Sequence, residues 1–373
     1  MLPRKEDRAQ TLSAPILVVG NVHSGTTLLQ KILASHPDVY AGYGETQFYP
    51  NLAVIRSHFR DLGSPAVHRN YLLYLIKLIT RNFNEAESAF REDRLDNVLD
   101  DASNSTIYAS AEEESHGLCH YQRLYFLIFD IVAAHKGACR WLEKTPAHIF
   151  HIDNIVQCQP TARIIEMVRD PRAVLASKRA RSQEEWLGTR EKNRAVHAAG
   201  GYDPVLHSFA WKSACRQGKR AKDRHPGNIF AIRYEDLVQN PEDSIKAVCD
   251  FVDLQYTQEM LQVSITNSTS HRPDSPSGIS ASAINRWQTQ LPESAILICS
   301  RVNRAEIRDW GYEPYHVRHK RSYLALPIVF SRSLWEFCKI VWKRWRLRGT
   351  AYLFDLSSSY LRRVRNLTGS LSK

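Results

Sequence analysis

The fold of this chain is decided near its amino end by the stretch Pro15-Ile-Leu-Val-Val-Gly-Asn-Val-His-Ser-Gly-Thr-Thr-Leu-Leu29. A short apolar run ends at Gly20, a small polar loop follows, and an apolar-periodic segment opens at Leu28. This order predicts a buried strand, a tight turn and the start of a helix. Such a turn directs backbone N–H groups and the positive end of the helix dipole at one point, which favours a phosphate-like anion. The loop residues expected to bind it are Ser24, Gly25, Thr26 and Thr27.

This loop has the outline of a phosphate-binding P-loop with one part missing. A P-loop for nucleoside triphosphates ends in Gly-Lys-Ser/Thr, and its lysine reaches the β and γ phosphates. In this chain Gly25 is followed by Thr26 instead of a lysine. The sequence therefore predicts a site for a single phosphate group and disfavours a nucleotide kinase or NTPase.

The length and composition of the chain limit its size class, its partners and its compartment. The chain has 373 residues, 43% of them hydrophobic, so it can bury a large core and is near the upper size of one domain. A net charge of +11 and a pI of about 9.3 predict anionic partners, which by charge alone are nucleotide, nucleic acid, acidic glycan or membrane surface. Seven scattered cysteines favour free thiols in a reducing compartment, and the first residues carry no hydrophobic signal core. We therefore expect a cytoplasmic protein.

Further strand-to-helix units follow the first. Residues 161–168 read as a buried strand, after which Asp170 and Pro171 are suited to open a helix as its N-cap and first residue. Residues 228–237 repeat the pattern, and residues 139–146 offer a strand that ends in Lys144. This alternation predicts an α/β protein with a mostly parallel sheet covered on both faces. Ligands of such sheets bind beyond the carboxyl ends of the strands, where the loops converge.

The order of these motifs resembles the signature of PAPS-dependent sulfotransferases, more the bacterial and tyrosylprotein branch than the cytosolic aryl branch. PAPS is 3′-phosphoadenosine 5′-phosphosulfate. The resemblance spans residues 15–312 and rests on Ser24-Gly-Thr-Thr27, Lys144-Thr-Pro146, Arg169-Asp-Pro-Arg with Ser177, Arg233-Tyr-Glu-Asp236 and Arg286-Trp287. It implies a P-loop NTPase-like three-layer fold, with about five mostly parallel strands and helices on both faces. We expect this domain over residues 14–315.

The resemblance also implies a role for individual residues. Ser24 to Thr27 hold the 5′-phosphosulfate, while Arg169 and Ser177 bind the 3′-phosphate that ordinary ATP lacks. Tyr234 and Arg286 contact the cofactor. An arginine suits a phosphate dianion, because its planar guanidinium can donate two parallel hydrogen bonds to phosphate oxygens. Lys144 is expected to neutralise charge on the leaving 5′-phosphate, and no metal is expected, because the protein can supply the cations itself.

Two further residues concern the reaction itself. Transfer of a sulfuryl group to a hydroxyl or amine by in-line displacement needs a base near the phosphosulfate loop. The segment with Glu45 is similar to the tyrosylprotein branch, in which a glutamate at this motif is the base. One departure concerns His23, because most relatives carry arginine or lysine immediately before Ser-Gly-Thr-Thr. This histidine can still donate a hydrogen bond to the bridging oxygen or the leaving phosphate. Alternatively it is a weaker substitute, and Lys144 then neutralises more of the charge on the leaving phosphate.

Several segments keep more than one interpretation. Residues 55–114 are expected to form the acceptor wall, and residues 182–203 a lid or a solvated loop. The tail over residues 316–373 is basic and rich in aromatics, which suits either a helix in the plane of a membrane or one packed on the domain. The spacing of a group of His and Cys residues superficially resembles a zinc site, but without a Cys-x-x-Cys pair we expect no metal. That group comprises His116, Cys119, His120, His135 and Cys139.

The acceptor stays open at this stage: a small molecule, glycan, lipid or peptide all suit a sulfotransferase. Peripheral contact with a membrane through the tail is an option, and no nucleic acid is expected as partner. Two other functions compete with sulfuryl transfer. One is a P-loop-like nucleotide kinase or NTPase. The other is a basic membrane- or nucleic-acid-binding protein with a vestigial nucleotide pocket, for which polyanion binding would depend strongly on salt.

Overall fold

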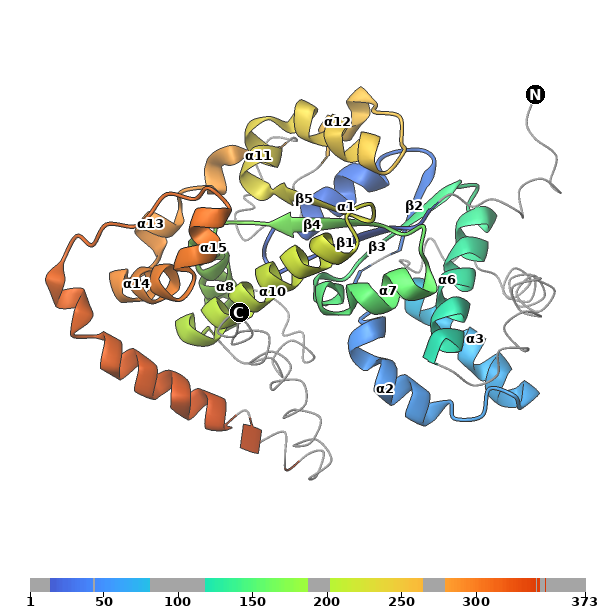
Figure 1. Cartoon of the computed structure of the whole chain (residues 1–373), viewed down its shortest axis with the longest axis horizontal. Coiled ribbons are helices and arrows are strands. Elements are labelled where there is room, and N and C mark those ends of the chain that lie inside the picture. Colours follow the sequence, from blue (N-terminus) through green and yellow to red (C-terminus); the bar gives the residue numbers. More distant parts are fainter. Residues whose placement is uncertain are drawn as a thin grey trace.

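The computed structural model describes residues 14–42, 44–80, 118–186, 202–263 and 279–339, together with 341, 342 and 346. Its centre is a five-stranded sheet in the order β2-β3-β1-β4-β5, in which every neighbouring pair is parallel (Figure 1). The strands are β1 (Ile16–Gly20), β2 (Val39–Ala41), β3 (Arg140–Lys144), β4 (Arg163–Val168) and β5 (Ile229–Arg233). The number and direction of the strands confirm the prediction.

The central strand β1 explains why the sheet is buried on both faces. Its five residues are all buried, and successive side chains point to opposite faces. Leu17 and Val19 join one hydrophobic core, whereas Ile16 and Val18 join another. A strand that is apolar on both faces needs a cover of helices on each.

One face of the sheet is covered by helices that follow β1 and β5 in the chain. They are α1 (Thr26–Ala34), α11 (Tyr234–Gln239) and α12 (Pro241–Phe251), with the 3-10 turn η4 (Gln258–Leu261). Leu29 and Leu33 of α1 and Ile245 and Val248 of α12 pack in the same core as Ile16. Figure 1 shows α1, α11 and α12 on one side of the sheet.

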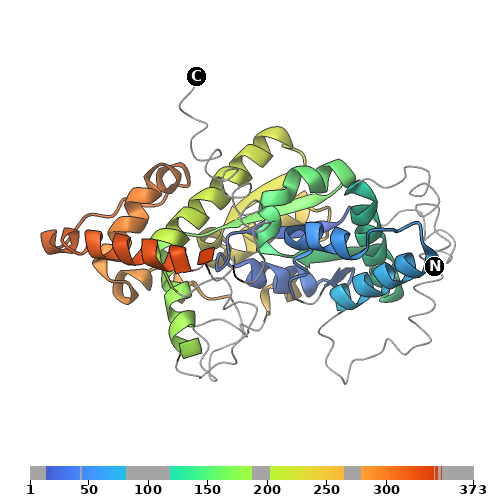
Figure 2. The same ribbon diagram turned by 90° about the horizontal axis from the view of Figure 1, so that it is seen from below.

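The opposite face carries a larger set of helices. They are α2 (Phe48–His58), α3 (Pro65–Thr80), α6 (Leu118–His135), α7 (Ile152–Cys158) and α10 (Pro204–Arg224), with the 3-10 helix η3 (Pro146–His151). Their core contains Trp141 of β3 stacked on Phe129 of α6 at 4.3 Å between ring centroids. Helices therefore cover both faces, and the predicted three-layer architecture is confirmed (Figures 1 and 2).

The remaining elements form one end of the molecule. They are α8 (Pro171–Trp186), η5 (Ala281–Ala283), α13 (Trp287–Gln290), α14 (Glu293–Val302), α15 (Arg304–Asp309) and η6 (Lys320–Tyr323), after which residues 326–339 are helical. Ala173 and Ala176 of α8 pack on Trp287 and Ile296, which joins α8 to α13 and α14. This end lies opposite α3 in Figure 1.

Two predicted substrate segments fall partly outside the described residues. Of the expected acceptor wall, residues 55–58 end α2, residues 65–80 form α3 after a short connection, and residues 81–114 lie outside. Of the expected lid, residues 182–186 complete α8, and residues 187–201 lie outside. In the described part of the chain no helix is long and apolar enough to span a bilayer.

Candidate functional site

The loop after β1 depends on glycine at both of its ends. Gly20 has a φ of 143°, and a Cβ at that position would lie 2.4 Å from the carbonyl oxygen of Met167 on β4. Gly25 has a φ of 94°, and a Cβ there would lie 2.5 Å from Cδ2 of Tyr234. Because any side chain would collide at these positions, the loop lies directly against β4 and the start of α11. His23 also adopts a positive φ, of 67°, which places its backbone in a sparsely populated conformation.

The loop delivers N–H groups to the carboxyl edge of the sheet. The N–H groups of Leu28 and Leu29 donate to the carbonyl oxygen of Gly25, whereas the structure gives no acceptor for those of Thr26 and Thr27, and no side chain caps this helix start. Ser24 is fully buried, and its Oγ has no hydrogen-bond partner in the structure. Thr26 is buried and Thr27 is exposed. A buried hydroxyl without a partner beside free N–H groups fits an anion that supplies the missing acceptors.

Arg169 follows β4 and reaches across to this loop. Its guanidinium donates to the backbone oxygen of His23 and to that of Ala283 in η5, each at 3.3 Å. The same group lies over the ring of Tyr234, 4.2 Å from the centroid. Arg169 is 9% exposed, and its Nε has no hydrogen-bond partner. Carbonyl and ring contacts leave the charge of this buried arginine without an anion among the partners described for it.

The two predicted phosphate pockets meet at His23. Its Nδ1 lies 3.2 Å from Oγ of Ser177, two turns into α8. Burial, and then nearby positive charges, lower the pKa of His23 to about 3. Those charges belong to Lys178, Arg181 and Arg169; His207 lies among them, but burial lowers its own pKa as well. The imidazole is therefore neutral near pH 7, at the centre of a group of cations.

The turn that carries Arg169 is fixed by a buried ion pair and by buried hydrogen bonds. Asp170 accepts from the backbone N–H of Arg172 at 2.8 Å, which confirms it as the cap of α8. The guanidinium of Arg172 binds both oxygens of Asp170 and lies 4.2 Å from the ring centroid of Trp287. Glu235 accepts from the N–H of Asp170 at 3.0 Å and from the hydroxyl of Tyr312 at 2.9 Å. Arg169 thus projects from a rigid support.

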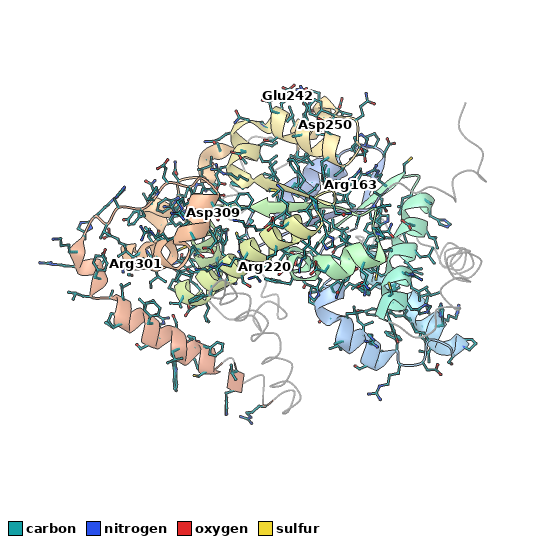
Figure 3. All side chains as sticks on the ribbon, in the orientation of Figure 1. Arg163, Arg220, Glu242, Asp250, Arg301 and Asp309 are labelled. Carbon is teal, nitrogen blue, oxygen red and sulfur yellow. The ribbon has the colours of Figure 1, made fainter. Side chains whose placement is uncertain are left out.

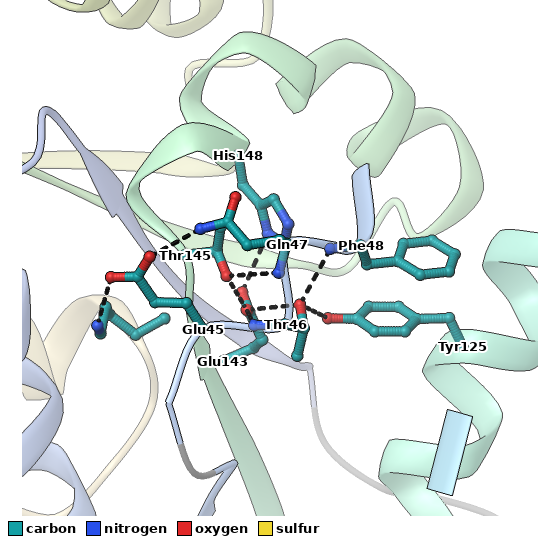
Figure 4. A network of polar contacts seen from close by, with 9 residues as sticks. Glu45, Thr46, Gln47, Phe48, Tyr125, Glu143, Thr145 and His148 are labelled. Atoms are coloured by element: carbon teal, nitrogen blue, oxygen red, sulfur yellow. Dashed lines mark hydrogen bonds and ion pairs between the residues drawn. The ribbon is translucent and has the colours of Figure 1, made fainter. Parts of the chain in front are cut away.

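A second group of polar residues lies at the ends of β2 and β3. Nζ of Lys144 lies 2.9 Å from Oε1 of Glu45, and Oε2 of Glu45 accepts from Gln47 at 2.7 Å (Figure 4). Lys144 pairs with Val18 in the register of β3 and β1, so it ends its strand beside the phosphate loop. The side chain of Lys144 is 7% exposed, whereas that of Glu45 is 35% exposed. The carboxylate is therefore open to an incoming molecule.

A buried carboxylate supports this pair from below. Oε1 of Glu143 accepts from Oγ1 of Thr46 at 2.9 Å and from the hydroxyl of Thr145, and Oε2 lies 3.0 Å from Nδ1 of His148. The hydroxyl of Tyr125 is 3.0 Å from Oγ1 of Thr46. Burial favours the protonated acid, but His148 and the two threonine hydroxyls outweigh burial and lower the pKa of Glu143 below its ordinary value. Figure 4 shows this network beside Glu45, on the side away from the Lys144 contact.

Arg286 is the one predicted site residue that turns back onto its own segment. Its Nε donates to the backbone oxygen of Ser282 at 3.1 Å, and its NH2 group bonds the hydroxyl of the same serine. It remains three residues from Ala283, which Arg169 contacts. Of the histidines and cysteines with zinc-like spacing, His116 lies outside the described residues. Within the described ranges no three His, Cys, Asp or Glu side chains gather as a metal site would require.

The sequence comparison decides the family. The profile of the sulfotransferase family matches residues 15–258, which includes the loop after β1, Lys144, Arg169, Ser177 and Tyr234. The chain is a member of the sulfotransferase family.

Individual relatives of this sulfotransferase are distant. A putative protein-tyrosine sulfotransferase of Caenorhabditis briggsae is 27% identical over 247 residues, which cover 66% of this chain and 68% of that protein. The protein-tyrosine sulfotransferase of Drosophila melanogaster is 21% identical over 316 residues, covering 81% and 52%. Carbohydrate sulfotransferase 6 of Homo sapiens is 28% identical over 191 residues, covering 46% and 47%. The chain thus spans about half the length of the last two relatives.

Among solved structures, the sulfotransferase domain from the Synechococcus PCC 7002 olefin synthase aligns with a TM-score of 0.45 and 19% identity. The alignment covers 81% of this chain and 96% of that domain.

Some residues of the site were missed by the sequence analysis. Glu143 carried a signal, since a charged residue within a buried strand needs a partner. Lys178 directly follows Ser177 and joins the cations around His23, yet a lysine in a helix is usually solvated. His207 is contributed by α10, thirty residues beyond Ser177, and no local pattern indicated it.

Proposed function

We propose that this sulfotransferase moves the sulfuryl group of PAPS to an acceptor hydroxyl or amine. The observation that carries the proposal is the convergence of the loop after β1, Arg169 and Ser177 on one group of cations. Ser24 Oγ and Arg169 Nε are buried there without partners. A ligand with a 5′-phosphosulfate and a 3′-phosphate supplies acceptors for both, and its negative charge offsets the mutual repulsion of the cations.

The binding roles follow from position. Ser24, Thr27 and the N–H groups at the start of α1 hold the 5′ end, as helix starts hold phosphate groups generally. Arg169 and Ser177 hold the 3′-phosphate. Tyr234 fixes the guanidinium of Arg169 from beneath, and its ring closes the space next to Gly25. We also assign Arg286 a contact with PAPS. To make this contact, its side chain must break the hydrogen bonds to Ser282 when PAPS binds.

His23 stands between the two phosphate positions. In the free protein its Nδ1 contacts Ser177 and its pKa is about 3. A phosphate dianion beside the imidazole raises that pKa, so the ring gains a proton and a donor when the ligand binds. His23 thereby replaces the permanent charge of the arginine or lysine that most relatives carry at this position.

The chemistry is assigned to Glu45 and Lys144. A bound PAPS supplies an electrophilic sulfur and a phosphate leaving group. Glu45 takes the proton from the acceptor hydroxyl as the new oxygen–sulfur bond forms. The bond from sulfur to the bridging phosphate oxygen breaks in line, and Lys144 neutralises the charge that develops on the 5′-phosphate. The contact of 2.9 Å between Nζ of Lys144 and Oε1 of Glu45 holds both groups in place before the acceptor arrives.

The acceptor is proposed at the level of its reacting group. The relatives named above are protein-tyrosine and carbohydrate sulfotransferases, so a phenolic or sugar hydroxyl is the first class to test. An exposed glutamate next to half-buried Gln47 can receive either one from solvent.

A radiolabelled transfer assay tests the proposal. The full chain is incubated with PAPS labelled at sulfur and with tyrosine peptides or sulfatable glycans, in the presence of a metal chelator. We expect labelled product from wild-type protein and a large loss in Glu45→Gln. Glu242→Gln, on the exposed surface of α12, serves as the matched control. Absence of transfer to any hydroxyl acceptor, with intact binding of the product nucleotide, would overturn the catalytic part of the proposal.

A further inference from the structure

The net charge of the chain is confined to its last segment. Residues 316–373 contain 13 Lys and Arg against 2 Asp and Glu, a net charge of +11 that equals the charge of the whole chain. The first 315 residues are therefore electrically balanced. A charge concentrated in one segment indicates an anionic partner for that segment, separate from the phosphate site.

The same segment exposes most of the large apolar side chains that face solvent. Six of the nine large hydrophobic residues exposed in the described chain lie between residues 324 and 342. Ile328, Trp335 and Trp342 are 70%, 65% and 55% exposed. Their spacing of seven residues places them in one row along a helix. Single exposed apolar residues are ordinary, but a contiguous row marks an interaction surface.

Basic side chains form the neighbouring row. Arg332, Lys339 and Arg346 repeat the same spacing, each four residues beyond a member of the apolar row, so the two rows adjoin. The guanidinium of Arg346 lies 5.0 Å from the ring centroid of Trp342. Cations next to tryptophans and aliphatic residues are typical of helices that lie in a bilayer interface.

Only a narrow strip on the other side of this helix is covered. Ser333 is 4% exposed and Val329 and Phe337 are half-buried, whereas Phe330 and Leu334 beside this strip are 46% and 64% exposed. The described part of the helix therefore presents most of its surface outward, and that surface is apolar and basic. In Figure 1 the helix lies at the outer edge of the molecule, beyond α13 and α14, and Figure 3 draws its side chains below the one labelled Arg301.

A carboxylate ties the start of this segment to the domain. Glu293, at the first position of α14, accepts from the hydroxyls of Tyr315 and Ser322, at 3.0 and 2.6 Å. It also accepts from the backbone N–H groups of Arg318 and His319. These bonds lower the pKa of Glu293 to about 2, so it stays ionised at physiological pH. The entry to the helix is thus held in a fixed position on α14.

We propose that the outward side of residues 326–342 binds the surface of a bilayer that contains anionic phospholipid. The cations bind lipid headgroups, and Ile328, Trp335 and Trp342 enter the boundary between headgroups and acyl chains. Leu324 and Ile328 favour lipid over nucleic acid, because aliphatic side chains offer no surface for base stacking. This inference does not depend on the proposed transfer reaction.

Vesicle co-sedimentation of the full chain tests the proposal. The probes are vesicles of phosphatidylcholine alone and of phosphatidylcholine mixed with phosphatidylglycerol. We expect binding to the mixed vesicles only, weakening about fivefold for each cation removed in Arg332→Gln and Lys339→Gln. Trp335→Ser with Trp342→Ser should lower the bound fraction about tenfold or more. Phe209→Ser is the matched control, since Phe209 is also exposed, at 42%, but lies on α10.

A fluorescent label gives a second readout. Cys338 is exposed near the tryptophan row, and Cys139 is exposed on another part of the protein. A polarity-sensitive dye on Cys338, in a Cys139→Ser background, should shift to the blue with mixed vesicles, and a dye on Cys139 in Cys338→Ser should not. Equal binding to neutral vesicles, or no loss in the tryptophan variant, overturns the proposal. Assembly into dimers that the tryptophan variant abolishes, without vesicle binding, assigns the surface to a second copy, and DNA binding that the same variant abolishes assigns it to nucleic acid.

Discussion

The two sides of the candidate site are built in opposite ways. On the donor side, after β1 and β4, cations surround a neutral histidine and buried donors lack partners. On the acceptor side, after β2 and β3, Lys144 is paired with Glu45 and the carboxylate of Glu143 is surrounded by donors. The donor side has a buried hydroxyl and a buried guanidinium N–H without acceptors, whereas on the acceptor side both carboxylates have partners of their own. The comparison teaches that ligand charge should stabilise the first side and leave the second almost unchanged.

The largest expected effect concerns the acceptor side. Glu45→Gln removes the proposed base but keeps the size of the side chain. Loss of general base catalysis should lower the transfer rate by about 10²- to 10⁴-fold. The affinity for adenosine 3′,5′-bisphosphate (PAP) should stay within error of wild type, because Glu45 does not contact the donor phosphates. Steady-state rates and calorimetry measure the two quantities, and a full rate in this variant would remove Glu45 from the mechanism.

The next effect concerns the donor side. Arg169→Ala removes a charged donor of the 3′-phosphate and should weaken PAP binding by about 10- to 100-fold, the usual range for a hydrogen bond to a charged group. Arg163→Ala is the matched control, because Arg163 begins the same strand at the opposite end and pairs with Asp253 at 3.2 Å. Similar losses of affinity in both variants would contradict a site at the carboxyl edge of β4.

A third change tests the support of the acceptor side. Glu143→Gln replaces a buried acceptor of two threonine hydroxyls and should lower the free energy of unfolding by about 1–3 kcal/mol. Since the pKa of Glu143 is lowered in the folded state, its contribution is present above the unfolded value of 4.5 and is lost as pH falls through the folded value. Transfer should slow about tenfold with unchanged PAP affinity, as expected for a positioning residue.

If Glu143→Gln instead weakened PAP binding as much as it slowed transfer, Glu143 would support both sides of the site. That result would contradict the view that the donor side and the acceptor side are stabilised separately. Urea unfolding at several pH values and the separate measurement of kcat and PAP affinity distinguish the outcomes.

Per pH unit, the smallest effect is the pH dependence of the stability that the donor side contributes. His23 has a pKa of about 3 in the folded protein and 6.5 as its ordinary value, so the unfolded chain binds more protons between these values. Its contribution to stability is therefore present above pH 6.5 and declines as pH falls toward 3, by at most about 1.4 kcal/mol per pH unit. The stability difference between wild type and His23→Asn should follow this slope. Saturating PAP should flatten it, and an unchanged slope with PAP would contradict anion binding beside His23.

Local patterns were enough to predict the parts of the site that each strand carries at its own end. The apolar run before Gly20 and the cap at Asp170 fixed where the loop and Arg169 must lie, because parallel strands end at one edge. Glu45 was expected near the loop, and its contact with Lys144 joins residues 99 positions apart.

What could not be predicted depends on the order of the strands. Glu143 meets Thr46 only because β3 lies between β2 and β1, which no local pattern fixes. His207 approaches His23 because α10 packs beside α8. Arg286 bonds to Ser282 through one of several side-chain conformations that the same backbone allows. The sequence could therefore predict a contact between Arg286 and the cofactor, but not the direction in which the arginine side chain points.

A calorimetric comparison of PAP with adenosine 5′-monophosphate tests the central claim most directly, because the two ligands differ by the 3′-phosphate alone. If the loop at Ser24 and the pair Arg169 and Ser177 grip one molecule, PAP binds about tenfold or more tightly in wild type, and Arg169→Ala removes the preference. Equal affinities of the two nucleotides for the wild-type protein would contradict the account.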